Sequence, residues 1–327
     1  MKRFAGFDRI FLGGMLACLM ALGVHTTRAD EYPTRPIRLL VGAPAGGTTD
    51  TIARAIAGPM SAALKQSVIV ENRPGAGGNL AAETVAKATP DGYTLLVSFS
   101  SHTINASLYP NLPYDPAADF TAITKVATVP SLLIGNPKLP VGDLKSLIDL
   151  AKAQPGKLTI GLGGIGSSLH LAGEKFKMMT GVQLLNVPYK GTAPAPTDLL
   201  GGQIDLMFIS FVTGAEHVKA RTVRAYGVTT AQRQPGFPDI PAIAEVVPGF
   251  ESSAWFGVFG PAKLPEAITN KLNGVIVASL SDPVLRKRLE TEGATPVGDT
   301  SNEFATFVRE DIKRWAPIVK ASGATAN

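Results

Sequence analysis

The chain has 327 residues, of which 45% are apolar and 17% are charged, and it contains 34 Gly, 25 Pro and a single Cys. This composition excludes an intrinsically disordered chain, a coiled coil and a fibrous repeat. One Cys excludes a disulfide scaffold and any zinc site built from cysteines, and the His residues lack the helical spacing of metal ligands. We therefore expect neither a metal nor a cofactor.

The formal net charge of +5 is concentrated at the N-terminus. The first 29 residues hold four basic residues and one acidic residue, so the rest of the chain is only weakly basic. Its one basic run is Arg286–Arg288. Nucleic-acid binding needs a clustered basic surface, so no nucleic-acid partner is expected.

The N-terminal segment has the pattern of a secretory signal peptide covering residues 1–29. Lys2 and Arg3 precede an apolar run, Ile10–Val24, and Ala29 is the small residue expected at a cleavage site. The apolar run is shorter than the ~20 residues that span a bilayer. The only Cys lies inside this run, in a poor match to a lipoprotein signal. The remaining chain has no Cys, which suits the oxidising bacterial periplasm.

Short apolar runs recur along the rest of the chain and predict strands. They are Ile37–Val41, Val68–Glu71, Thr94–Ser98, Ser131–Ile134, Leu158–Leu162, Leu184–Val187, Ile204–Ile209, Val223–Val228 and Ala254–Phe259. Most of them are nearly continuously apolar rather than alternating, which is typical of buried parallel strands.

Helical patterns lie between and after these runs. Asp143–Ala153 and Ser168–Met179 each place apolar residues on one face. Another helix is predicted to start at Asp282-Pro283, and the capping box Thr300–Glu303 starts the last one. In the last helix the apolar side chains have helical spacing, whereas Asp311 is expected to face water.

Alternating strands and helices predict an α/β protein with mostly parallel sheets. The length favours two domains. The C-terminal helices need a sheet to cover, so the chain is expected to return to the first domain. With connections near Val126–Ser131 and Phe250–Trp255, we predict one lobe from residues 30–128 and 252–327 and a second lobe from residues 129–251.

The first candidate site is the Gly-rich loop Gly42–Asp50, which follows a predicted strand. Its spacing resembles a phosphate-binding loop, but Thr48 stands where the essential Lys would be. Backbone N–H groups that lead into a helix favour an anion such as a carboxylate. A plain glycine turn with Asp50 as helix cap is the alternative.

A second loop, Gly161–Ser168, matches GxGxxG between a strand and a helix. No acidic residue ends the next strand to hold a ribose, so an anion site is favoured over a dinucleotide site. A third segment, Ser98–Asn105, offers hydroxyl and amide groups to a polar ligand or simply forms a capped turn. Lys190 is a candidate cation for the cleft, or a surface residue.

Catalysis has little support in the sequence. Ser167, Ser168 and His170 are close neighbours on one predicted helix, where only residues three or four apart meet. There is no GxSxG elbow. Trp255 and Phe256 are expected to belong to the core beside a hinge rather than to stack on a ligand.

Several motifs together resemble one family, the periplasmic solute-binding proteins of the tripartite tricarboxylate transporter type, known as Bug receptors. The motifs are Pro44–Asp50, Glu71–Asn79, Pro90–Leu95, Leu112–Asp115, Gly164–Glu174, Val187–Gly191, Asp198–Asp205 and Trp255–Gly257. The resemblance implies a two-lobed Venus flytrap of type II-like topology. It also implies a monomeric, non-enzymatic receptor that holds a small organic acid between its lobes and delivers it to membrane permease subunits.

The same resemblance implies a set of ligand-binding residues. These are Ala43, Pro44, Ala45, Gly46, Gly47, Thr48 and Asp50 in the first loop; Ser98, Ser100 and Asn105 in the same lobe; and Gly164, Gly166, Ser167, His170, Tyr189, Lys190 and Asp205 in the other lobe. In this family the ligand is held largely by backbone amides, hydroxyls and water. The family often has an aromatic residue where Ala43 stands, so we expect a roomier pocket and a ligand bulkier than aspartate or glutamate.

Two other functions stay open at this point. An exported dinucleotide-dependent or hydrolytic enzyme would use the Gly161–Gly166 loop. A ligand sensor would dock on a signalling ectodomain instead of a permease.

Overall fold

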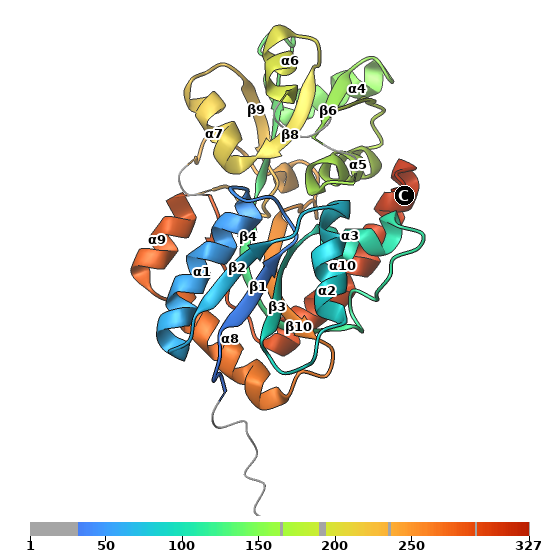
Figure 1. Cartoon of the computed structure of the whole chain (residues 1–327). Helices are drawn as coiled ribbons and strands as arrows, with labels where there is room; N and C mark the ends of the chain where they lie inside the picture. The colour runs from blue at the N-terminus through green and yellow to red at the C-terminus, as the bar shows by residue number, and fades with distance from the viewer. Residues whose placement is uncertain (1–31, 164–165, 190–193, 235–236, 292, 327) are drawn as a thin grey trace, which may run out of the picture. The chain divides into compact units, whose positions relative to one another are not determined.

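The computed structural model describes residues 32–163, 166–189, 194–234, 237–291 and 293–326. The predicted signal peptide at residues 1–29 lies outside these ranges. Ten α-helices of the described residues flank two separate β-sheets (Figure 1).

The first sheet has the strand order β11-β4-β10-β3-β1-β2. Its strands are β1 (Ile37–Val41), β2 (Val68–Asn72), β3 (Thr94–Phe99), β4 (Phe120–Val129), β10 (Ala254–Pro261) and β11 (Thr295–Pro296). β1 pairs in parallel with β2 and β3, whereas β10 is antiparallel to both β3 and β4. The returning strand β10 is therefore inserted between two strands that run in the same direction.

The second sheet has the strand order β7-β6-β8-β5-β9. Its strands are β5 (Ser131–Gly135), β6 (Thr159–Leu162), β7 (Leu185–Pro188), β8 (Leu206–Ser210) and β9 (Arg224–Val228). β6 pairs in parallel with β7 and β8, whereas β5 is antiparallel to β8 and β9. One reversed strand is again inserted among strands of common direction.

These reversed strands correct one detail of the predicted fold. The two-sheet, helix-flanked α/β fold is confirmed, but both sheets are mixed rather than mostly parallel. The reason is the path of the chain between the sheets: β4 passes into β5 through Pro130 alone, and β10 carries the chain back. A strand that enters a sheet at the edge where its neighbours end must run against those neighbours.

The helices occupy the connections between strands. They are α1 (Thr48–Leu64), α2 (Asn79–Ala86), α3 (Ser101–Leu108), α4 (Leu144–Ala153), α5 (Ser168–Thr180), α6 (Ala195–Gly201), α7 (Phe211–Lys219), α8 (Glu266–Leu280), α9 (Pro283–Thr291) and α10 (Ser301–Ser322). Two short 3-10 turns lie at Ala76–Gly78 and Ile243–Glu245. Around the first sheet, α1, α8 and α9 gather on one flank and α2, α3 and α10 on the other (Figure 1).

The predicted C-terminal helix α10 begins at its capping box, in which the Thr300 side chain accepts from the Glu303 amide. The prediction that Asp311 faces water is wrong, because its side chain is buried. It accepts hydrogen bonds from Trp255 Nε1 over 2.8 Å and from Thr103 Oγ1 over 2.6 Å, and it pairs with Arg314. The indole in the returning strand needs an acceptor inside the core, and Asp311 supplies it.

One apolar cluster joins helices that belong to different sheets. Leu108 of α3, Leu171 of α5, and Trp315 and Ile318 of α10 are buried against one another. α5 follows a strand of the second sheet, whereas α3 and α10 pack beside the first. The cluster therefore fixes the start of α5, which matters for the site described next.

Candidate functional site

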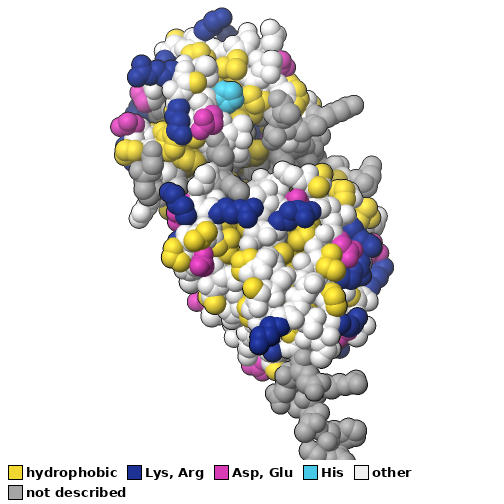
Figure 2. Space-filling view, turned by 60° about the vertical axis from the view of Figure 1, so that its left-hand side comes forward, with side chains coloured by type: hydrophobic (Ala, Val, Ile, Leu, Met, Phe, Trp, Pro, Cys, Tyr) yellow, Lys and Arg dark blue, Asp and Glu magenta, His cyan; other side chains and the backbone are white. Residues whose placement is uncertain are grey.

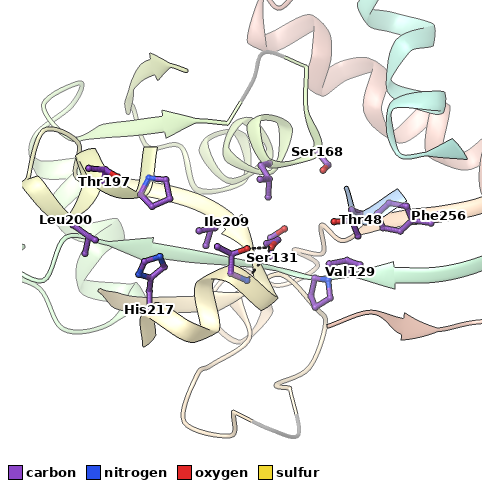
Figure 3. A pocket seen from close by; sticks show the side chains of 15 residues that line it. Thr48, Val129, Ser131, Ser168, Thr197, Leu200, Ile209, His217 and Phe256 are labelled. Atoms are coloured by element: carbon purple, nitrogen blue, oxygen red, sulfur yellow. Dashed lines mark hydrogen bonds between the residues drawn. The ribbon is translucent and has the colours of Figure 1, made fainter. Parts of the chain in front are cut away.

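A cavity of about 680 Å³ lies where β4 passes into β5, where β8 ends and where β10 begins. Its described wall consists of Thr48, Val129, Pro130, Ser131, Ser168, Leu169, Pro196, Thr197, Leu200, Ile209, Ser210, Thr213, His217, Ala254 and Phe256 (Figure 3). A smaller hollow of about 380 Å³ shares part of this wall and extends it toward Gly46, Thr291 and Ala294. Both sheets thus contribute to one site.

Three helices begin at this cavity. Thr48 is the first residue of α1, Ser168 is the first residue of α5, and Ser210 is the N-cap of α7. The amides at a helix start are unpaired within the helix and carry partial positive charge. Their convergence makes the cavity suitable for an anion.

Apart from His217, the side chains of the wall are uncharged hydrogen-bonding or apolar groups. Hydroxyls come from Thr48, Ser131, Ser168, Ser210 and Thr213 among others, and the Ser210 and Thr213 hydroxyls are 3.1 Å apart. No Lys, Arg, Asp or Glu belongs to the wall as far as its residues are described. An anion bound here would be held by dipoles and hydroxyls rather than by a salt bridge.

The first predicted loop is shaped by Asp50, which is buried. Its carboxylate accepts from the Gly46 amide over 2.9 Å and from Asn72 Nδ2 over 3.0 Å, and it pairs with Arg54 at 3.0 Å. Burial would raise the pKa of this carboxyl, but the hydrogen bonds from Arg54, Gly46 and Asn72 outweigh burial and hold the pKa below its usual value. Asp50 therefore braces the loop, and Thr48 is the loop residue that reaches the main cavity.

The second predicted loop is braced by His170. The Gly166 amide donates to His170 Nδ1 over 2.9 Å, and His170 Nε2 lies 3.4 Å from Glu174 Oε1. The Ser167 hydroxyl caps α5 by accepting from the His170 amide over 3.2 Å. The His170 ring is buried and both of its nitrogens have partners, so His170 holds the loop in place. Ser168, the residue after the capping Ser167, lines the cavity.

The sequence profile of the tripartite tricarboxylate transporter family receptor matches residues 52–324 of this chain. The chain belongs to this receptor family. It is 38% identical to the protein BugT of Bordetella pertussis over 299 residues, which cover 90% of this chain and 92% of BugT.

Solved structures of similar binding proteins agree with this family assignment. The receptor is 38% identical, with a TM-score of 0.77, to Rpa4515 of R. palustris with adipate, over 90% of this chain and 99% of that one. It is 34% identical, with a TM-score of 0.73, to MatC of Rhodopseudomonas palustris with bound malate, over 88% of this chain and 100% of that one. The two-lobed binding-protein fold is thereby established for the receptor.

Other predicted residues of the first loop flank the cavity in the receptor. Gly46 lines the smaller hollow, and Gly47 is the N-cap of α1. Ala43, Pro44 and Ala45 precede them without belonging to the described wall, and the Ala43 carbonyl accepts from Asn72 over 3.0 Å. The predicted residues Gly164 and Lys190 lie outside the described residues.

Three predicted residues serve the interior of the receptor instead of the cavity. Ser98, Ser100 and Asn105 are buried. The Ser100 hydroxyl accepts from the Trp255 amide over 3.0 Å, and Asn105 Nδ2 donates to Asn79 Oδ1 over 2.6 Å. These bonds tie α3 to its neighbours, whereas the Ser100 side chain makes no capping hydrogen bond at the start of α3.

Two further predicted residues lie away from the described wall. Asp205 stands at the start of β8, whereas the cavity is at its end, Ser210. The Asp205 carboxylate accepts from the amide and hydroxyl of Thr159, each over 2.8 Å, and so ties β6 to β8. Tyr189 donates to Asp198 Oδ2 over 2.7 Å, and burial together with this bond raises the pKa of Tyr189 to about 12.

Sequence reasoning misses much of the receptor's wall. Ser131, Ser210 and His217 carry no glycine-rich signature, although Ser210 stands at a strand end that precedes a helix. Phe256 is predicted to be core, and although almost buried it lines the cavity. A search for hydroxyl residues at every strand-to-helix junction would have found Ser210.

The described residues contain no cluster of three or more His, Cys, Asp or Glu side chains that could hold a metal ion. Among the same residues no helix combines the length and apolarity needed to cross a membrane. On the face shown in Figure 2, basic side chains are scattered among acidic and uncharged ones.

Proposed function

We propose that this receptor captures a small organic carboxylate in the cavity between its sheets and delivers it to permease subunits of a tripartite tricarboxylate-type transporter. The observation that carries the proposal is the convergence of the helix starts at Thr48, Ser168 and Ser210. Each helix start contributes about 0.3–1 kcal/mol to an exposed anion and more in partly buried geometry. The adipate and malate named for two relatives agree with this chemistry.

The proposal includes export to the periplasm, directed by residues 1–29, and action as a monomer without enzymatic activity. Support for the last point comes from His170, the imidazole nearest to Ser167 and Ser168 in sequence. Its Nδ1 accepts from the Gly166 amide instead of from either hydroxyl. We also propose that residues 30–128 with 252–327 and residues 129–251 form the two lobes that close on the ligand. The passage of β4 into β5 through Pro130 supports this division.

Ligand binding is tested first by thermal shift and calorimetry with adipate, malate, aromatic acids and NAD. A ligand at about 100 times its Kd adds about 2.7 kcal/mol to the free energy of unfolding. Carboxylates should stabilise the protein and NAD should not. Stabilisation by NAD alone would overturn the proposal in favour of a dinucleotide enzyme.

The role of the helix starts is tested with Ser168→Asp and its neutral control Ser168→Asn. Asp is favourable in the first turn of a helix, so the fold should be retained. A second negative charge roughly 4 Å from a bound carboxylate costs about 4 kcal/mol at an effective dielectric constant of about 20. The Asp variant should therefore bind at least a hundredfold more weakly than the Asn variant, and equal affinities would exclude this cavity as the carboxylate site.

A further inference from the structure

His217 is the only ionisable side chain among the described residues of the cavity wall. It lies on α7, at the end of the cavity that also holds Thr197 and Leu200, whereas Thr48 and Phe256 mark the other end (Figure 3). The cavity therefore has two chemically different ends.

One nitrogen of the His217 ring is already engaged. Nδ1 lies 3.4 Å from Thr222 Oγ1, and the same hydroxyl donates to the His217 carbonyl over 3.2 Å. Nε2 is the ring atom left for a ligand.

An imidazole nitrogen that carries a hydrogen donates well to a carboxylate oxygen. His217 would give Nε2–H to the ligand while keeping its Thr222 contact. On α7 itself the neighbouring charges are committed, since Glu216 and Lys219 pair at 3.2 Å. β5 and β8, which pack against α7, carry no charged side chain.

The wall between the two ends mixes apolar and hydroxyl side chains. Ile209 lies there together with Ser131 and Ser168 (Figure 3). Such a lining fits an uncharged segment of a ligand and offers no charged partner to a group placed midway. A ligand that uses the whole cavity should therefore carry one acidic group at the helix starts, an uncharged middle and a second acidic group at His217.

From these observations we propose that His217 is a specificity-determining residue that selects acids with a second carboxylate over monocarboxylates of the same length. This inference rests on the proposed function, because it places the first carboxylate at the helix starts of α1 and α5. It goes beyond that function by assigning the discrimination between acids to one side chain.

The test measures Kd by calorimetry for matched pairs of straight-chain acids with four to seven carbons: succinate with butyrate, glutarate with pentanoate, adipate with hexanoate, and pimelate with heptanoate. The wild type should bind at least one diacid tenfold or more tightly than its monoacid partner. In His217→Gln that preference should disappear, with the diacid weakened to the level of the monoacid and the monoacid unchanged.

Lys219→Gln is the matched control, because it removes a positive charge from the exposed side of the same helix without touching the cavity. It should keep the diacid preference. Equal binding of diacids and monoacids by the wild type, or a loss in His217→Gln that is the same for both, would overturn the role of His217 while leaving carboxylate capture intact. Binding of no carboxylate by the wild type would instead overturn the proposed function.

Discussion

The Trp255 indole nitrogen donates a hydrogen bond to the Asp311 carboxylate over 2.8 Å, and both side chains are buried. The bond joins the start of the returning strand β10 to the middle of α10. Thr103 of α3 donates to the same carboxylate over 2.6 Å. One carboxylate therefore holds together three elements that lie beside the start of α5.

Asp311→Ala should destabilise the protein by about 3 kcal/mol, because it leaves buried donors on Trp255 and Thr103 without an acceptor. Asp311→Asn keeps one acceptor oxygen and should cost less. Denaturant unfolding followed by Trp fluorescence measures both losses. A loss well below about 1 kcal/mol for Asp311→Ala would show that water replaces the carboxylate at little cost.

Gly166 is expected to tolerate a side chain poorly. Its φ is +75°, and a Cβ atom there would lie 2.3 Å from Leu108 Cδ2. Gly166→Ala should therefore lose about 1–3 kcal/mol through backbone strain and overpacking together. The result is read from the midpoint of chemical denaturation.

Gly181→Ala separates the two causes. Gly181 has a similar φ of +72°, but nothing lies within 4 Å of the place that a Cβ atom would take there. It should show the backbone cost alone, so the excess loss in Gly166→Ala measures the clash with Leu108. Equal losses in the two variants would mean that Leu108 moves aside freely.

His102 makes the stability depend on pH. Its ring is buried among Tyr114, Phe120 and Phe259, and Nδ1 has no hydrogen-bond partner among the described residues. Burial lowers the pKa of His102 from 6.5 to about 4, with only partial compensation by the Pro116 carbonyl. The unfolded chain therefore binds more protons than the folded chain between these two values, and stability falls as the pH falls from about 6.5 to about 4.

The difference between the two pKa values of His102 lowers the free energy of unfolding by up to about 3 kcal/mol, at 1.36 kcal/mol per pKa unit. His102→Phe keeps an aromatic ring in the cluster and should flatten the free energy of unfolding over this pH window. Denaturant titrations at several pH values measure the slope. If the free energy of unfolding depends on pH between 6.5 and 4 as strongly in the variant as in the wild type, other groups cause this dependence.

Ala43→Phe should shift ligand preference toward smaller acids, because it adds a ring to the loop that leads to Thr48. Competition calorimetry with a short diacid and a bulky aromatic acid measures the change. The bulky acid should lose affinity and the short diacid should not. An unchanged preference would mean that position 43 does not limit the size of the ligand.

Much of the fold could be predicted from the sequence, because short and mostly apolar runs such as Ile37–Val41, bounded by turn residues, are typical of buried strands. The sequence pattern does not reveal β4, since Phe120–Val129 mixes Thr and Lys with its apolar residues and only its end is predicted, as a connection between lobes. β11 is two residues long and is defined by its pairing with β4 rather than by its own pattern.

The candidate site was less accessible to sequence reasoning. The glycine loops point to Thr48 and to the start of α5, because a helix start after a strand is visible in the sequence. Asp50 and His170 look like ligand-binding groups in the same loops. Tertiary packing brings Asn72 of β2 to Asp50, whereas Glu174 lies one helical turn beyond His170 on α5. His217 stands in a helix with no motif, and only the fold brings it to the cavity.

The absence of Lys and Arg from the described wall of the cavity has a consequence for unloading. A carrier that binds an acid through a buried Arg or Lys leaves that charge unpaired each time the acid departs. Leaving a buried charge unpaired costs several kcal/mol. Thr48, Ser168 and Ser210 leave behind only hydroxyls and helix amides, which water can satisfy at once. Departure of the cargo then creates no stranded permanent charge on the described wall, so discharge can proceed without a compensating ion.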